Sequence, residues 1–155
     1  MLDAGLLAQV VRLATDNVAD GGGPFGAMIV RDGSVVATGT NQVTAAPDPT
    51  AHAEIVAIRA ACRSIGDFRL DGCVLVASCE PCPMCLAAAL WSRVDRVIYA
   101  ADRDDAAAAG FDDRAFYELF EQSRSTWPVA VTQLSTADAT APFSAWLAKP
   151  ERVSY

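Results

Sequence analysis

The sequence predicts an α/β protein, a three-layer α/β/α domain around a central five-stranded mixed sheet. An initial strand hairpin is followed by helical and strand patterns that alternate along the chain, which is typical of this fold class. The chain has 155 residues, of which 52% are hydrophobic, and this suits one domain with its own core. We therefore expect residues 1–155 to form a single domain.

The first half of the chain predicts a helix, a hairpin and a second helix. Apolar residues at helical spacing give the first helix, which Gly21-Gly22-Gly23-Pro24 ends. Asp32-Gly33 stands between two short β-branched runs and is typical of a tight hairpin turn. The expected elements are a helix over 3–19, strands over 25–30 and 35–40, and a helix over 51–64.

The second half predicts three more strands and three more helices. Pro81 and Pro83 suit a helix entrance, because proline has no N–H to leave unpaired in a first turn. Val129–Gln133 is β-branched and is expected to add the fifth strand. The expected elements are strands over 73–77, 96–100 and 129–133, and helices over 84–91, 113–121 and 142–148.

Charge and cysteine content exclude several classes of protein. The net charge is −7 and the 12 Lys and Arg residues are scattered, whereas a nucleic-acid-binding chain would present a basic face. No apolar run reaches the roughly 20 residues of a membrane span, and residues 1–20 lack the pattern of a signal peptide. Five cysteines without a secretory signal indicate a reducing compartment. We expect a cytoplasmic protein that binds neither nucleic acid nor membrane.

Three residues suit a zinc site. Cys82 and Cys85 are spaced for the first turn of a helix, and His52, the single histidine, opens another helix. These three ligands would leave one position of a tetrahedral Zn²⁺ open for water, and an open position indicates catalysis. A lone C-x-x-C could also be a redox pair or half of a structural zinc ribbon. A ribbon needs a second C-x-x-C, and the remaining thiols Cys62, Cys73 and Cys79 form no such pair among themselves, while redox chemistry gives no role to the flanking prolines.

Glu54 is the candidate proton carrier, two residues after His52. The arrangement H-x-E…P-C-x-x-C is a known signature of zinc deaminases, and this sequence matches it at His52, Glu54, Pro81, Cys82 and Cys85. Its chemistry is clear, since one carboxylate beside water and base can accept a proton and return it. The alternative is that Glu54 is an ordinary solvent-facing residue of the helix. Glu80, between Cys79 and Pro81, could hydrogen-bond either a ligand or its own loop.

The chain resembles the cytidine-deaminase-like superfamily over nearly its whole length, and is most similar to the bacterial guanine deaminases. The His52 and Cys82 blocks are shared by deaminases of several bases, whereas the Gly-Phe-Asp-Asp block and the terminal tyrosine point to guanine. The blocks that carry the resemblance are residues 22–27, 48–54, 78–85, 110–113, 142–146 and Tyr155.

The resemblance implies roles for individual residues. It implies that His52, Cys82 and Cys85 hold Zn²⁺, that Glu54 and Asp113 are catalytic, and that the base is bound by Phe25, Asn41, Ala53, Asp113 and Tyr155. It also implies a homodimer in which the C-terminal segment is exchanged between subunits. Simpler alternatives are a turn cap for Asn41, a helix cap for Asp113 and a frayed end for Tyr155.

The leading hypothesis is a hydrolase of purine metabolism that deaminates guanine to xanthine with Zn²⁺. The alternatives are a deaminase of another free base, nucleoside or guanine-like heterocycle, such as cytosine, guanosine or an aminotriazine. A transfer-RNA adenosine deaminase is disfavoured by the acidic chain. A zinc-stabilised binding module without turnover would need a closed site with four ligands.

Overall fold

The Asp-Gly dipeptide forms the hairpin that the sequence predicts. In the computed structural model, which describes residues 2–155, β1 (Gly26–Arg31) and β2 (Ser34–Thr40) pair antiparallel. Asp32 and Gly33 have positive φ angles of 51° and 75°, which is the backbone that a type I′ turn requires at both central positions. The hairpin forms one side of the sheet.

The sheet is mixed and has the order β2-β1-β3-β4. β1 pairs antiparallel with β3 (Cys73–Cys79), and β3 pairs parallel with β4 (Arg96–Ala101). β3 has a neighbouring strand on each side, and all of its residues except Val74 are buried. This central position explains why its sequence is a continuous apolar run rather than an alternation.

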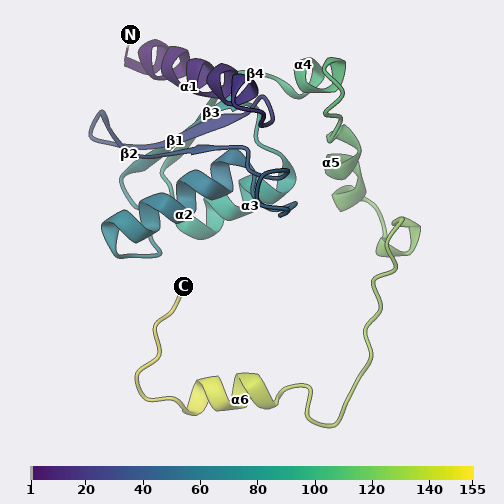
Figure 1. The fold of residues 1–155 in the computed structure, drawn as a ribbon. Coiled ribbons are helices and arrows are strands. Elements are labelled where there is room, and N and C mark those ends of the chain that lie inside the picture. The colour runs from purple at the N-terminus through teal and green to yellow at the C-terminus, as the bar shows by residue number, and fades with distance from the viewer. Residues whose placement is uncertain (1) are drawn as a thin grey trace. The chain divides into compact units, whose positions relative to one another are not determined.

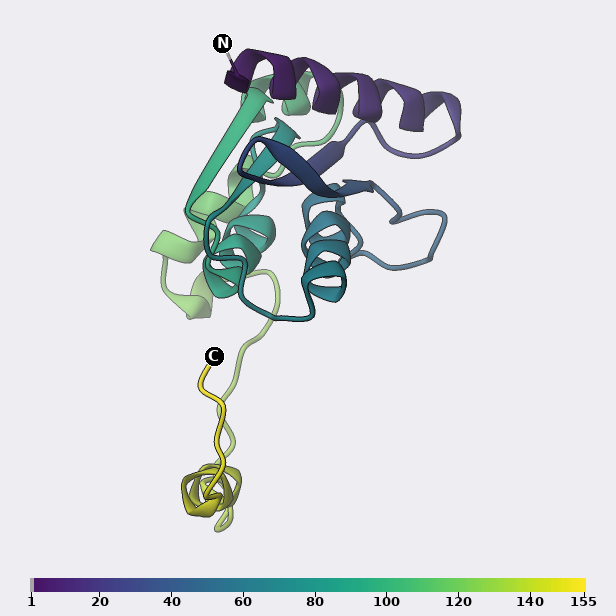
Figure 2. The ribbon, with the colours of Figure 1, turned by 90° about the vertical axis from the view of Figure 1, so that its left-hand side faces the viewer.

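Helices cover both faces of the sheet and create three layers (Figures 1 and 2). α1 (Leu2–Ala19) lies on one face, while α2 (Ala53–Ile65) and α3 (Pro83–Ser92) lie side by side on the other. Side chains alternate along β1, so Met28 packs beneath α1 and Ile29 belongs to the cluster that includes α2. The predicted α/β/α layering is therefore confirmed.

The predicted fifth strand is wrong, because the sheet has four strands within the described residues. Residues 129–133 take no strand conformation, and Val129 and Val131 are exposed. A β-branched run forms a strand only where a neighbouring strand supplies the other half of the hydrogen-bond ladder, and this segment pairs with none. The composition of this segment indicated a strand, but it carries no information on whether a neighbouring strand is there to pair with it.

One short helix was not predicted. α4 (Arg103–Ala108) begins at Asp102, whose carboxylate accepts hydrogen bonds from the N–H groups of Asp104 and Asp105 at 2.9 Å. The Asp105 carboxylate accepts the Asp102 N–H in return, which completes a capping box. The sequence signal was therefore present in Asp102-x-x-Asp105, before an alanine run.

The chain divides into two compact units, one ending at Tyr117 and the other covering Glu118–Tyr155. α5 (Arg114–Glu121) runs across this boundary. The second unit then contains a 3-10 turn (Arg124–Thr126) and α6 (Ala141–Ala148), neither of which has a buried residue. None of the helices in residues 2–155 has the length and apolar character that a membrane crossing needs.

Candidate active site

The N-terminal ends of α2 and α3 meet at the candidate metal site. His52 is the N-cap residue of α2, Cys82 is the N-cap residue of α3, and Cys85 lies in the first turn of α3. Pro83 occupies the start of α3 as expected. The positive ends of two helix dipoles are thus directed at the thiols, and they favour thiolate over thiol.

The distances between the ligand atoms fit zinc. His52 Nδ1 lies 3.5 Å from Cys82 Sγ and 3.6 Å from Cys85 Sγ. Around a tetrahedral zinc with ordinary Zn–S and Zn–N bond lengths, a nitrogen and a sulfur ligand are about 3.6 Å apart. All three ligand atoms lie within 4.8 Å of one another, and within the described residues they form the one cluster of this kind. Three ligands leave a coordination position for water.

Proton positions in this cluster also suit a metal site. A hydrogen bond from Cys85, with help from His52, lowers the pKa of Cys82 to about 4. The Cys82 sulfur and burial hold the pKa of Cys85 above its usual value, because two adjacent thiolates repel each other. Contact with Cys82 likewise raises the pKa of His52. A divalent cation would replace this shared proton and allow both sulfurs to ionise.

Glu54 lies in the first turn of α2 with only 8% of its surface exposed. Burial raises the pKa of its carboxyl group, as expected for a carboxylate removed from water. Its neighbours include the Cys85 thiol, and the two groups influence each other's pKa. The solvent-facing alternative for Glu54 is therefore excluded by its burial.

A pocket of about 500 Å³ opens beside the metal cluster. Six of the residues to which the resemblance gives a metal, catalytic or substrate role line it: Phe25, Asn41, His52, Glu54, Cys82 and Asp113. Ala53 is fully buried and does not line it. Among the described residues of the lining, four are acidic and none is Lys or Arg. The pocket therefore suits an uncharged ligand rather than a phosphorylated one.

The apolar wall of the pocket is an aromatic pair. The rings of Phe25 and Phe111 meet edge to face, with centroids 5.0 Å apart and planes at 89°. Sequence reasoning selected Phe25 but assigned no role to Phe111, although Phe111 belongs to the Gly-Phe-Asp-Asp block. A flat heterocycle could pack against this pair.

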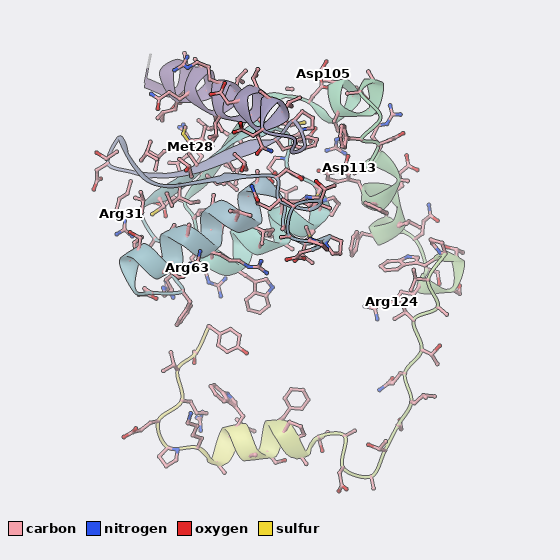
Figure 3. The ribbon with its side chains drawn as sticks, viewed as in Figure 1. Met28, Arg31, Arg63, Asp105, Asp113 and Arg124 are labelled. Carbon is pink, nitrogen blue, oxygen red and sulfur yellow. The ribbon has the colours of Figure 1, made fainter. Side chains whose placement is uncertain are left out.

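Asn41 and Asp113 provide polar groups in the same pocket. Asn41 Oδ1 accepts a hydrogen bond from the Val43 N–H at 3.2 Å, and this orients the side-chain amide, whose other end is the Nδ2 donor. Asp113 lies where the chain enters α5 (Figure 3). Burial raises the pKa of its carboxyl group, and the negative charge of Cys82 adds to this effect.

The remaining sequence-selected residues lie elsewhere or have other partners. Tyr155 belongs to the second unit, where 73% of its surface is exposed. Glu80 lines the pocket, but its carboxylate forms an ion pair with Arg103, a contact between residues 23 positions apart that the sequence could not indicate. The buried Cys79 thiol donates to the carbonyl oxygen of Asp102, and burial raises its pKa to about 11.

The fold and the His52, Cys82 and Cys85 cluster define a zinc-binding deaminase domain. Residues 2–101 match the family described as the cytidine and deoxycytidylate deaminase zinc-binding region, and the chain belongs to this family. Its cofactor is accordingly zinc.

Guanine deaminases are among the individual relatives that match most of the chain. Guanine deaminase of Bacillus subtilis (strain 168) is 48% identical over 141 residues, which are 90% of each sequence. A solved structure of guanine deaminase from Bacillus subtilis matches with a TM-score of 0.95 and 45% identity, covering 98% of each chain. A solved mutant protein in complex with 8-azaguanine matches with a TM-score of 0.69 and 38% identity, covering 73% of this chain and 65% of that chain.

A transfer-RNA enzyme is similar over a shorter region. The tRNA-specific adenosine deaminase of Aquifex aeolicus (strain VF5) is 45% identical over 78 residues, which are 50% of this chain and 52% of that protein. The similarity to the Bacillus subtilis guanine deaminase thus covers much more of the chain than the similarity to this transfer-RNA enzyme.

Proposed function

We propose that this protein hydrolyses guanine to xanthine and ammonia. The observation that carries the proposal is the buried Glu54 carboxylate beside a three-ligand zinc cluster in a pocket that also contains Asp113. The similarity of nearly the whole chain to a guanine deaminase supports the choice of base.

His52, Cys82 and Cys85 would hold the zinc ion. When bound, zinc supplies the Lewis acidity that makes water a nucleophile near neutral pH. Glu54 takes a proton from the attacking water and passes it to a ring nitrogen; it then takes the proton of the added hydroxyl group and passes it to the departing amine, which leaves as ammonia. Its burial favours this exchange, because a raised pKa brings the carboxyl group closer to neutral pH.

Substrate recognition would use other residues of the pocket. Guanine presents N–H groups at N1 and at its 2-amino group, and the Asp113 carboxylate is an acceptor suited to that edge. The Nδ2 of Asn41 can donate to an acceptor of the purine, while Phe25 and Phe111 contact its flat face. Asp113 could also carry a proton toward the leaving amine, which would make it a second catalytic group.

Ammonia release from a panel of substrates tests this function. We expect turnover of guanine to exceed that of guanosine, cytosine, cytidine, adenine and an aminotriazine. Faster turnover of another member would replace guanine with that substrate. Absence of turnover from all of them, with zinc bound, would favour a structural zinc module. Tight, salt-sensitive binding of RNA would instead favour a transfer-RNA substrate.

We further propose a cytoplasmic homodimer in which the second unit is exchanged between subunits and supplies Tyr155 to the partner's pocket. Each chain would then act as one domain completed by its partner. The exposure of apolar side chains supports this, since 69% of Phe143 and 67% of Leu147 on α6 are accessible. A solution mass near twice 16.3 kDa by light scattering is expected, and a monomeric mass would contradict the exchange.

A further inference from the structure

Glu80 is held to the strand and helix that follow the metal site. Its N–H donates to the carbonyl oxygen of Ala101 at 2.9 Å. Its Oε2 accepts hydrogen bonds from the backbone N–H of Arg103 at 3.1 Å and from Arg103 Nε at 3.0 Å, while Oε1 accepts from Nη2. Only 13% of the Glu80 side chain is exposed. The carboxylate is therefore committed to Arg103.

Tyr117, on α5, contacts both Arg103 and the loop that precedes Cys82. The guanidinium carbon of Arg103 lies 3.7 Å from the centroid of the Tyr117 ring, which is a close cation–π contact. The Tyr117 hydroxyl donates to the carbonyl oxygen of Pro81. Glu80, Arg103 and Tyr117, which we call the Arg103 brace, thus fix both residues that precede Cys82.

The brace connects the two sides of the candidate active site. One end is the loop that delivers the zinc ligand Cys82, and the other is the first part of α5, which begins directly after Asp113. We propose that Arg103 is a positioning residue that sets the place of Cys82 relative to Asp113 during guanine deamination. This inference rests on the proposed function, and it assigns to the Glu80–Arg103 pair the role of positioning Cys82 relative to Asp113.

Charge explains why an arginine is needed at this place. Glu54, Glu80 and Asp113, three acidic residues, line the pocket together. Without Arg103, the largely buried Glu80 carboxylate would be left uncompensated and would be driven toward water. Lysine could restore the charge but neither the bidentate contact nor the stacking on Tyr117.

Four variants test the brace: Arg103→Leu, Arg103→Lys, Glu80→Gln and Tyr117→Phe. Arg96→Leu is the matched control, because Arg96 lies at the start of β4 and pairs with Asp3 in an exposed ion pair. We expect Arg103→Leu to lower kcat for guanine by about 10–100-fold with little change in KM, and Arg103→Lys to recover part of the loss. Rates are expressed per bound zinc, so that a smaller folded fraction of a variant does not lower its apparent kcat.

Cobalt substitution gives a second measurement that does not depend on turnover. The visible spectrum of bound Co²⁺ reports the geometry of its thiolate ligands, so Arg103→Leu, Glu80→Gln and Tyr117→Phe should each alter it, and Arg96→Leu should not. The double variant with Arg103→Leu and Glu80→Gln should have a kcat no lower than that of the less active single variant, because both substitutions break the same Glu80–Arg103 contact.

The outcomes separate the brace from the proposed function. If the Arg103 variants have a lower melting temperature but wild-type kcat per zinc and an unchanged cobalt spectrum, the role of Arg103 is only structural and the proposal is overturned. Additive losses in the double variant would also overturn it. If wild-type enzyme does not turn over guanine, the proposed function fails, and the cobalt spectra alone then decide whether the brace positions Cys82.

Discussion

The side chain of Asn17 on α1 ties Asn41 to the glycine turn of the pocket. Its Nδ2 donates to the carbonyl oxygen of Asn41 at 3.2 Å and to that of Gly23 at 2.8 Å, and only 8% of the residue is exposed. Gly22 packs so closely against this amide that an added Cβ would lie 2.3 Å from Nδ2. Two walls of the pocket, distant in sequence, are thus held by one side chain.

Removing this amide should weaken substrate binding. Asn17→Ala leaves two partly buried carbonyl groups without this donor, a loss of up to about 1–3 kcal/mol. If half of that loss is expressed in positioning Asn41, KM for guanine should rise by about two- to tenfold with zinc content unchanged. Steady-state kinetics measures this. Thr15→Ala is the control, because the exposed Thr15 hydroxyl donates within α1, to the carbonyl oxygen of Val11. A wild-type KM in Asn17→Ala would contradict the positioning role.

Replacing Glu54 by glutamine should stop the chemistry without disturbing the site. The amide keeps the size of the buried side chain but cannot accept a proton from water. We expect kcat to fall by about 10²–10⁴-fold, the usual contribution of general acid–base catalysis. Metal analysis and circular dichroism should match wild type. An enzyme that retains turnover after Glu54→Gln would remove the proposed mechanism.

Zinc content should distinguish the ligand cysteines from the others. Cys82→Ser removes a thiolate that lies 3.5 Å from His52 Nδ1, and should abolish stoichiometric zinc binding together with turnover. Cys62→Ser is the matched control, because Cys62 contacts the carbonyl oxygen of Phe68 and lies outside the ligand cluster. Elemental analysis of both purified proteins measures the difference. Equal zinc content in the two variants would refute the assignment of Cys82.

The turn before His52 should make stability depend on acid pH. The Asp48 carboxylate accepts hydrogen bonds from the hydroxyl and the N–H of Thr50, at 2.7 and 2.8 Å, and these bonds lower the pKa of Asp48. A lowered pKa means that the ionised form stabilises the folded state. That contribution is complete above the ordinary pKa of about 3.9 and is lost as pH falls through the lowered value.

The test compares wild type with Asp48→Asn, both freed of metal by chelation, using denaturant unfolding at a series of pH values. Wild type should be the more stable protein at pH 5–7, and the difference in the free energy of unfolding should shrink in more acidic solution. A difference that grows as the pH falls would have the opposite sign and would rule out the carboxylate as its source.

Local patterns predicted most of the fold. Asp32-Gly33 specified the hairpin, and Pro83 marked the start of α3, because each dictates its own backbone conformation. Val129–Gln133 failed because a strand depends on a distant neighbour. The metal cluster was predictable for a different reason: few residue types bind zinc, so His52 and the two cysteines were conspicuous despite their separation.

The supporting contacts of the site could not be predicted in the same way. Arg103 is one of many arginines, and nothing near it in sequence indicates Glu80 or Tyr117 as partners. Asn17 likewise looked like an ordinary polar residue on an amphipathic helix. Such contacts join residues whose proximity exists only after the sheet and helices have assembled.

Mixing two inactive variants tests whether the second unit crosses to a partner subunit. One chain carries Glu54→Gln and an intact C-terminal segment; the other keeps Glu54 but ends at Lys149 and so lacks Tyr155. In an exchanged dimer, the truncated chain has an intact zinc site and receives the missing segment from its partner. Co-expression with two affinity tags isolates the mixed dimer, which should have about half of the wild-type activity, since one of its two sites is complete. Each variant alone should be nearly inactive. If the segment served its own chain, neither site of the mixed dimer would be complete, and an inactive mixed dimer would therefore rule out the exchange.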